Sequence, residues 1–82
     1  MKEEKILTLN KILPVVERVH GEHHPELHQV AALYEEMKNT PSEEIFRKLR
    51  EVTQNYAVPA DACPTYVKTY RLLEALDREH VC

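Results

Sequence analysis

Residues 19–28 read VHGEHHPELH and hold four of the five histidines in the chain. Gly21 predicts the end of a helix within this stretch, because glycine takes the backbone conformations that close a helix C-terminus. Pro25 predicts the start of another helix, because proline fits the first helical position, where its missing amide costs nothing. The stretch therefore predicts a turn between two antiparallel helices, and the rest of the fold can be worked out from it.

Apolar residues continue at helical spacing on both sides of this turn, which predicts helices over about residues 5–20 and 25–38. In the first helix they are Ile6, Leu9, Leu13 and Val16, joined by Ile12, Val15 and Val19. In the second they are Leu27, Val30, Ala31, Tyr34 and Met37. Pro14 removes one amide and clashes with the carbonyl of Asn10, so it predicts either a kink or a helix that starts near Leu13.

Two more helices follow, over about residues 41–54 and 62–80. Residues 40–43, TPSE, match the capping box that precedes a helix. Asp61 is the predicted cap of the last helix, and Pro64 is tolerated in its first turn. Short links favour antiparallel neighbours. The sequence thus predicts an all-α, up-and-down four-helix bundle in a single domain, residues 1–82, or a dimer that completes such a bundle.

Composition excludes several classes of function. The formal net charge is -3 and the basic residues are scattered, so the basic stripe that nucleic acid requires is missing. No apolar run approaches the roughly 20 residues of a membrane span. The N-terminal residues are too charged for a signal peptide. We therefore expect a cytoplasmic protein that binds neither nucleic acid nor membrane, with Cys63 and Cys82 as free thiols.

The histidines are the first candidates for chemistry. His20, His24 and His28 are spaced four apart, yet Gly21 and Pro25 place them on a turn and not on one helix face. Side chains on a turn can converge on a metal ion, but spacing alone does not establish a site. The sequence leaves two interpretations open, namely a metal site and a solvated polar corner.

Glutamate and histidine three residues apart form a second candidate. Glu17 and His20 have the spacing by which di-iron bundles direct both side chains inward, and Asp77 with His80 is a weaker example. Antiparallel order places His80 far from His20, because the last helix is about 25 Å long; only a dimer or another topology would join them. The sequence contains neither a nucleophile-elbow motif nor a glycine-rich phosphate-binding loop, so we expect a binding protein more than an enzyme.

Cys63 is the third candidate. It begins the last helix, so the antiparallel order places it at the same end as the histidine turn. That makes it a better neighbour for His20 and His24 than His80 is. The alternative is that Cys63 is a small buried apolar residue, as free cysteines often are.

Two segments resemble the iron–sulfur cluster repair di-iron proteins, which carry a hemerythrin-like domain. They are VERVHGEHHPEL at 16–27 and REVTQNYAVPADACPTYVKTYRLLEALDREH at 50–80, and the most specific pattern is P-x-x-A-C-x-T-Y at 59–66. The resemblance implies a hemerythrin-like bundle and a non-haem di-iron centre. It also implies a role in repairing iron–sulfur proteins after oxidative or nitrosative stress, by supplying iron.

In this resemblance, His20 and His80 correspond to metal ligands of the family, and the family's other ligand motifs are missing. The family's central H-x-x-x-E is absent, and the glutamate of its terminal motif would fall two residues after Cys82. A bridged di-iron site needs about six or seven protein ligands. The sequence therefore predicts a reduced member that binds or delivers iron, alone or at a homodimer interface. The expected metal ligands are His20, His24 and Glu17, followed by His80 and Cys63.

Two other functions stay open. The bundle could be a metal-free interaction module that pairs with itself or with a full-length relative, because a small interrupted bundle exposes apolar surface. A zinc or haem site at the histidine turn is a third interpretation, since imidazole serves several metals.

Overall fold

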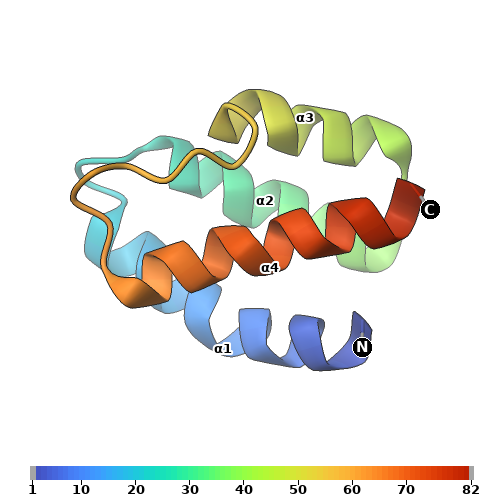
Figure 1. Ribbon diagram of the computed structural model, residues 1–82, viewed down its shortest axis with the longest axis horizontal. Coiled ribbons are helices and arrows are strands. Elements are labelled where there is room, and N and C mark those ends of the chain that lie inside the picture. Colours follow the sequence, from blue (N-terminus) through green and yellow to red (C-terminus); the bar gives the residue numbers. More distant parts are fainter. Residues whose placement is uncertain (1, 82) are drawn as a thin grey trace.

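The computed structural model of the protein describes residues 2–81, and the side chains of residues 3–80. It contains four helices, α1 (Lys2–His20), α2 (Glu26–Asn39), α3 (Glu43–Thr53) and α4 (Pro64–Val81). Successive helices run in opposite directions, and both ends of the described chain lie opposite the α1–α2 turn (Figure 1). The predicted all-α four-helix fold is confirmed.

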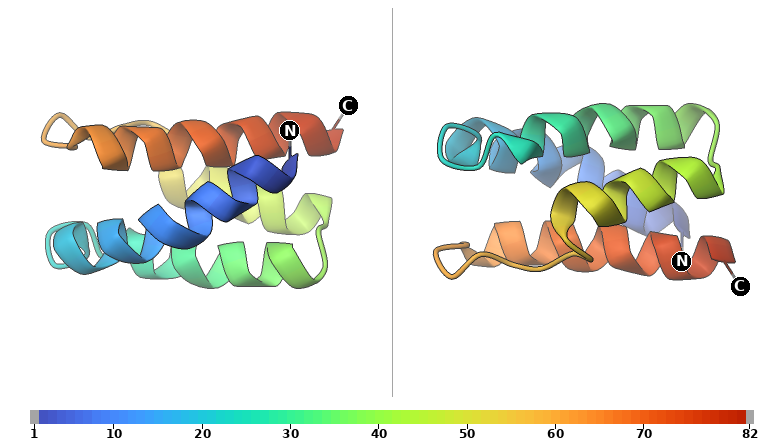
Figure 2. Two further views of the ribbon diagram at one scale, coloured as in Figure 1. Left: turned by 90° about the horizontal axis from the view of Figure 1, so that it is seen from below. Right: turned by 90° about the horizontal axis from the view of Figure 1, so that it is seen from above.

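The helices enclose one core. α1 packs against α2 and α4, α2 also packs against α3, and the contact between α3 and α4 is the smallest. In the two views of Figure 2, α1 and α3 lie on opposite sides of the layer formed by α2 and α4. The largest fully buried side chains are three tyrosines and a phenylalanine, namely Tyr34, Tyr66, Tyr70 and Phe46. Within residues 2–81, no helix has the length and apolar character that a membrane crossing requires.

α1 departs from its prediction in two ways. It is continuous from Lys2 to His20 with Pro14 inside it, so a helix start near Leu13 is wrong. Packing explains why the turns before Leu13 are helical. Leu9 is fully buried, and the Tyr34 hydroxyl donates a hydrogen bond to the Ile6 carbonyl at 3.0 Å.

The second departure concerns the outer side of α1. Val15 and Val19, which belong to the predicted apolar stripe, are 41% and 59% exposed, and Leu7 is 62% exposed. We call these three residues the α1 strip. The apolar positions of α1 form a stripe wider than the face that α2 and α4 cover, so part of it stays in contact with solvent.

The link between α2 and α3 also differs from the predicted capping box. α3 begins at Glu43, and its N-cap is Ser42, whose Oγ accepts a hydrogen bond from the Ile45 amide at 3.3 Å. Thr40 instead closes α2 by donating its amide to the Glu36 carbonyl at 2.8 Å. Serine is at least as good a cap as threonine, and its use leaves Thr40 free to end the preceding helix.

Residues 54–63 connect α3 to α4 through a strained start. Gln54, Asn55 and Tyr56 have φ values of 54°, 62° and 61°, a left-handed conformation that costs energy for residues other than glycine. The Tyr56 amide donates to Thr53 Oγ1 at 2.8 Å, which holds the segment in place. The segment then crosses to the histidine end of the bundle, where α4 starts at Pro64 (Figure 1).

Candidate metal site at the histidine turn

The α1–α2 turn is tight because of Gly21. The Gly21 amide donates to the Glu17 carbonyl at 2.9 Å, and the His24 amide donates to the His20 carbonyl at 2.8 Å. A Cβ atom at position 21 would lie 2.3 Å from the Glu17 carbonyl oxygen and 3.0 Å from the His28 ring. Only glycine fits this close approach, which fixes where His20 and His24 leave the backbone.

His20 meets Cys63 across the fold. Its Nε2 lies 3.3 Å from Cys63 Sγ, and the two residues are 43 positions apart in the sequence. Both side chains are half-buried. The prediction that Cys63 lies at the histidine end is confirmed. Cys63 also packs against the hydrophobic core, so the structure shows both the apolar packing and the contact with an imidazole.

His24 meets Asp61 in a second pair. Its Nε2 lies 3.1 Å and 3.2 Å from the two carboxylate oxygens of Asp61, and its Nδ1 lies 3.5 Å from Glu26 Oε2. The hydrogen bond from His24 lowers the pKa of the Asp61 carboxyl, so this group stays ionised at neutral pH. The prediction that Asp61 caps the last helix is wrong, since that helix starts at Pro64.

Asp61 is not among the predicted ligands. Antiparallel order places it beside the histidines as it does Cys63, because Asp61 lies two residues earlier in the same segment. That signal was available in the sequence.

The buried ring of Tyr66 lies against both histidines. Its centroid is 5.1 Å from that of His20 and 5.6 Å from that of His24, both in edge-on geometry. Its hydroxyl is buried and has no hydrogen-bond partner of good geometry among the described residues, although the Tyr70 hydroxyl approaches it. Burial raises the pKa of the Tyr66 phenol, so it stays neutral beside the histidines.

The other predicted ligands lie apart from these pairs. The Glu17 carboxylate bonds His28, with 2.7 Å between Oε2 and Nδ1. His80 is exposed and stacks on Phe46 with ring centroids 4.9 Å apart. It lies near the C-terminal end of α4, away from the histidine turn (Figure 1). Of the five predicted ligands, only His20 and Cys63 therefore contact each other, and His24 lies at the same end in a pair with Asp61.

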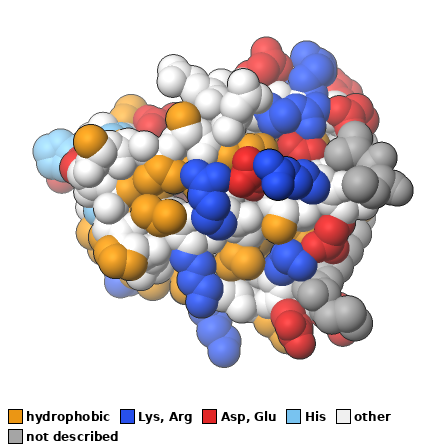
Figure 3. All heavy atoms as spheres, viewed as in Figure 1, with side chains coloured by type: hydrophobic (Ala, Val, Ile, Leu, Met, Phe, Trp, Pro, Cys, Tyr) orange, Lys and Arg blue, Asp and Glu red, His pale blue; other side chains and the backbone are white. Residues whose placement is uncertain are grey.

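This arrangement does not fit a di-iron centre. Within the described residues, no three His, Cys, Asp or Glu side chains converge as a single metal ion requires. The turn offers two pairs, His20 with Cys63 and His24 with Asp61. On the face shown in Figure 3, imidazole groups lie at this end of the molecule, and basic and acidic side chains mix across the middle.

Replacing Tyr66 by phenylalanine tests the buried hydroxyl. We expect the free energy of unfolding to stay the same or to rise by up to about 1 kcal/mol, because an unpaired buried hydroxyl costs more than it contributes. Urea unfolding followed by circular dichroism measures this change. A loss above about 1 kcal/mol would show that the hydroxyl has a working partner, with Tyr70 the first candidate.

No protein-family model, characterised protein or solved structure matches this chain. The resemblance to the iron–sulfur repair proteins therefore stays a prediction that rests on the two quoted segments.

Proposed function

We propose that the protein is a reduced hemerythrin-like bundle that binds a single divalent transition-metal ion at its histidine turn. The observation that carries the proposal is the 3.3 Å contact between His20 Nε2 and Cys63 Sγ. Two atoms of the kinds that bind transition metals, from distant parts of the chain, meet there. The resemblance to iron–sulfur repair proteins suggests that iron is the ion it carries and that iron–sulfur proteins receive it.

The donor chemistry narrows the choice of ion. Thiolate and imidazole together suit zinc and ferrous iron, whereas a bridged di-iron centre needs carboxylates that this turn does not supply. Binding requires the thiol and the imidazole to lose their protons, so affinity should fall in acid. We place the protein in the cytoplasm, where a free thiol such as Cys63 persists.

The test combines metal content with titration. Protein purified anaerobically after growth with iron should carry metal, and the apoprotein should take up Fe²⁺ or Zn²⁺ in calorimetry. His20→Ala should weaken binding by at least about 100-fold, because it removes a ligand outright. His23→Ala is the matched control, since His23 is exposed in the same turn and makes no side-chain hydrogen bond among the described residues. Equal binding by both variants, or none by the unmodified protein, would refute the proposal.

A metal-free interaction module is the second candidate, and the α1 strip favours it. Leu7, Val15 and Val19 expose apolar surface on one helix, which a partner would cover. This function predicts a complex that persists in chelator, with a second copy of the chain or a full-length relative. Sedimentation of the protein in excess EDTA measures it, and a monomer at every concentration would argue against self-association.

A further inference from the structure

We infer that a second copy of the chain completes the metal site. His20 and Cys63 from each of two copies would hold one Zn²⁺ ion on a two-fold axis. This inference rests on the proposed metal site. It adds a second copy and a set of four ligands, and it names zinc where the resemblance suggests iron. It differs from the dimer that would bring His80 of one chain to the histidine turn of another.

The spacing within the pair already suits one tetrahedral ion. Zinc lies about 2.3 Å from a thiolate sulfur and about 2.0 Å from an imidazole nitrogen, so two such ligands are about 3.5 Å apart. The observed separation of His20 Nε2 and Cys63 Sγ is 3.3 Å. The pair needs only a small opening, by a few tenths of an ångström, to hold an ion.

Each chain supplies half of what such an ion requires. Structural zinc sites are closed by four ligands, and within residues 2–81 no third His, Cys, Asp or Glu joins the pair. A two-fold axis duplicates every contribution, so two ligands per chain become four. The resulting set of two sulfur and two nitrogen atoms is the tetrahedral combination typical of zinc.

Completion within one chain is less favourable. His24 and Asp61 are the nearest alternatives, and they already bond each other at 3.1 Å and 3.2 Å. Recruiting them would break that pair and move the segment that positions Cys63. A second copy leaves the pair intact, so His24 and Asp61 act as positioning residues that hold the 54–63 segment against the turn.

The end of α1 that carries His20 also exposes apolar side chains. Val19 precedes His20 in the chain, and Val15 lies one turn earlier on the same helix; they are 59% and 41% exposed. A two-fold contact around this end of α1 would cover part of that apolar surface. A domain of 82 residues has a small core, and domains of this size are commonly stabilised by a metal or by oligomerisation.

Sedimentation equilibrium during zinc titration tests the inference. The measurements use the Cys82→Ser background, in which Cys63 is the remaining thiol. We expect a monomer in EDTA that becomes a dimer on adding ZnCl₂, with one ion per two chains. Co²⁺ in place of zinc should give the sulfur-to-cobalt charge-transfer intensity of two thiolates per ion.

Variants separate the ligands from the positioning residues. Cys63→Ala and His20→Ala should each abolish zinc-dependent dimerisation while keeping the helical circular dichroism spectrum. His24→Ala and Asp61→Asn should keep one ion per two chains and weaken binding by less than about 100-fold, as outer groups do.

The possible outcomes distinguish the two proposals. One ion per chain in a monomer would overturn the shared site and leave the proposed metal site standing. No binding of any metal would overturn both. A dimer that forms in EDTA and does not change with zinc would overturn the shared site and favour the metal-free interaction module.

Discussion

Replacing Arg50 by methionine is expected to lower the free energy of unfolding by about 2 kcal/mol. Arg50 Nη1 donates to the two carboxylate oxygens of Asp77 at 2.7 Å and 2.9 Å, and the Asp77 side chain is only 6% exposed. Methionine would leave that carboxylate buried without its cation. Fully buried pairs lose about 3–5 kcal/mol in such a test. The smaller value applies here because the Arg50 side chain is 30% exposed, so water replaces part of the interaction.

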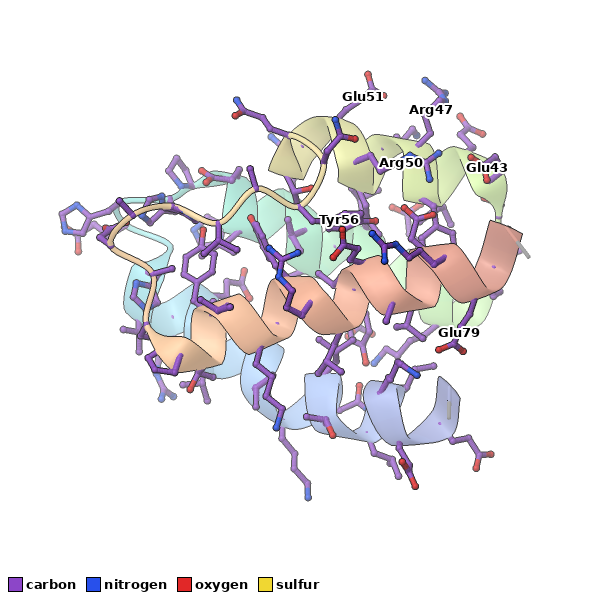
Figure 4. The ribbon with its side chains drawn as sticks, in the orientation of Figure 1. Glu43, Arg47, Arg50, Glu51, Tyr56 and Glu79 are labelled. Carbon is purple, nitrogen blue, oxygen red and sulfur yellow. The ribbon has the colours of Figure 1, made fainter. Side chains whose placement is uncertain are left out.

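Arg47→Met is the matched control on the same helix. Arg47 pairs with Glu51 at 3.3 Å, both side chains are more than half exposed, and Figure 4 shows Arg47 pointing away from α4. An exposed pair of this kind contributes about 0.5 kcal/mol. Urea unfolding of the two variants measures the difference. Equal losses would mean that the Arg50–Asp77 pair contributes no more than a surface pair.

The same pair connects the fold to the histidine site. The Tyr56 hydroxyl also donates to Asp77, at 2.9 Å, and Tyr56 is the last of the three left-handed residues that open the 54–63 segment. Burial and the bond to Asp77 raise the pKa of Tyr56, so its hydroxyl remains a donor. Figure 4 shows Arg50 and Tyr56 on the α4 side of α3. One end of the segment is therefore held by this cluster and the other by His20 and His24.

The helices could be predicted from the sequence because their signals are local. The backbone preferences of Gly21 and Pro25 predict the turn. The spacing of apolar residues, repeated within two helical turns, predicts the helices. The exposure of Val15 and Val19 could not be predicted. The spacing of apolar residues identifies the apolar face of a helix, but not how much of that face the neighbouring helices bury. The start of α3 was missed by two residues, since Thr40 and Ser42 both have the chemistry of a cap.

The candidate site could be predicted only in part. Antiparallel order was enough to bring Cys63 to the histidine turn, because it depends on helix direction alone. The same order places Asp61 at this end, two residues before Cys63. Which histidine Asp61 bonds, and the bond of Glu17 with His28, depend on side-chain rotamers, and no spacing rule contains that information.

Pro14→Ala is expected to raise the free energy of unfolding by about 2 kcal/mol. Proline inside a helix is about 3 kcal/mol less favourable than alanine, because it removes one amide and crowds the carbonyl four residues earlier. Pro14 lies in the middle of α1 and is exposed, so alanine loses no core contact there. Proline also restricts the unfolded chain, which offsets about 0.4–1 kcal/mol of the gain. Thermal and urea unfolding measure the net effect.

Pro41→Ala is the control with the opposite sign. Pro41 is exposed in the link between α2 and α3, outside any helix, so its replacement removes only the restriction on the unfolded chain. We expect a loss of up to about 1 kcal/mol there. If Pro14→Ala also lost stability, α1 would have to depend on the shape that Pro14 imposes for its packing on α2 and α4. Zinc-linked dimerisation of that variant would then show whether the same shape also sets the position of His20 relative to Cys63.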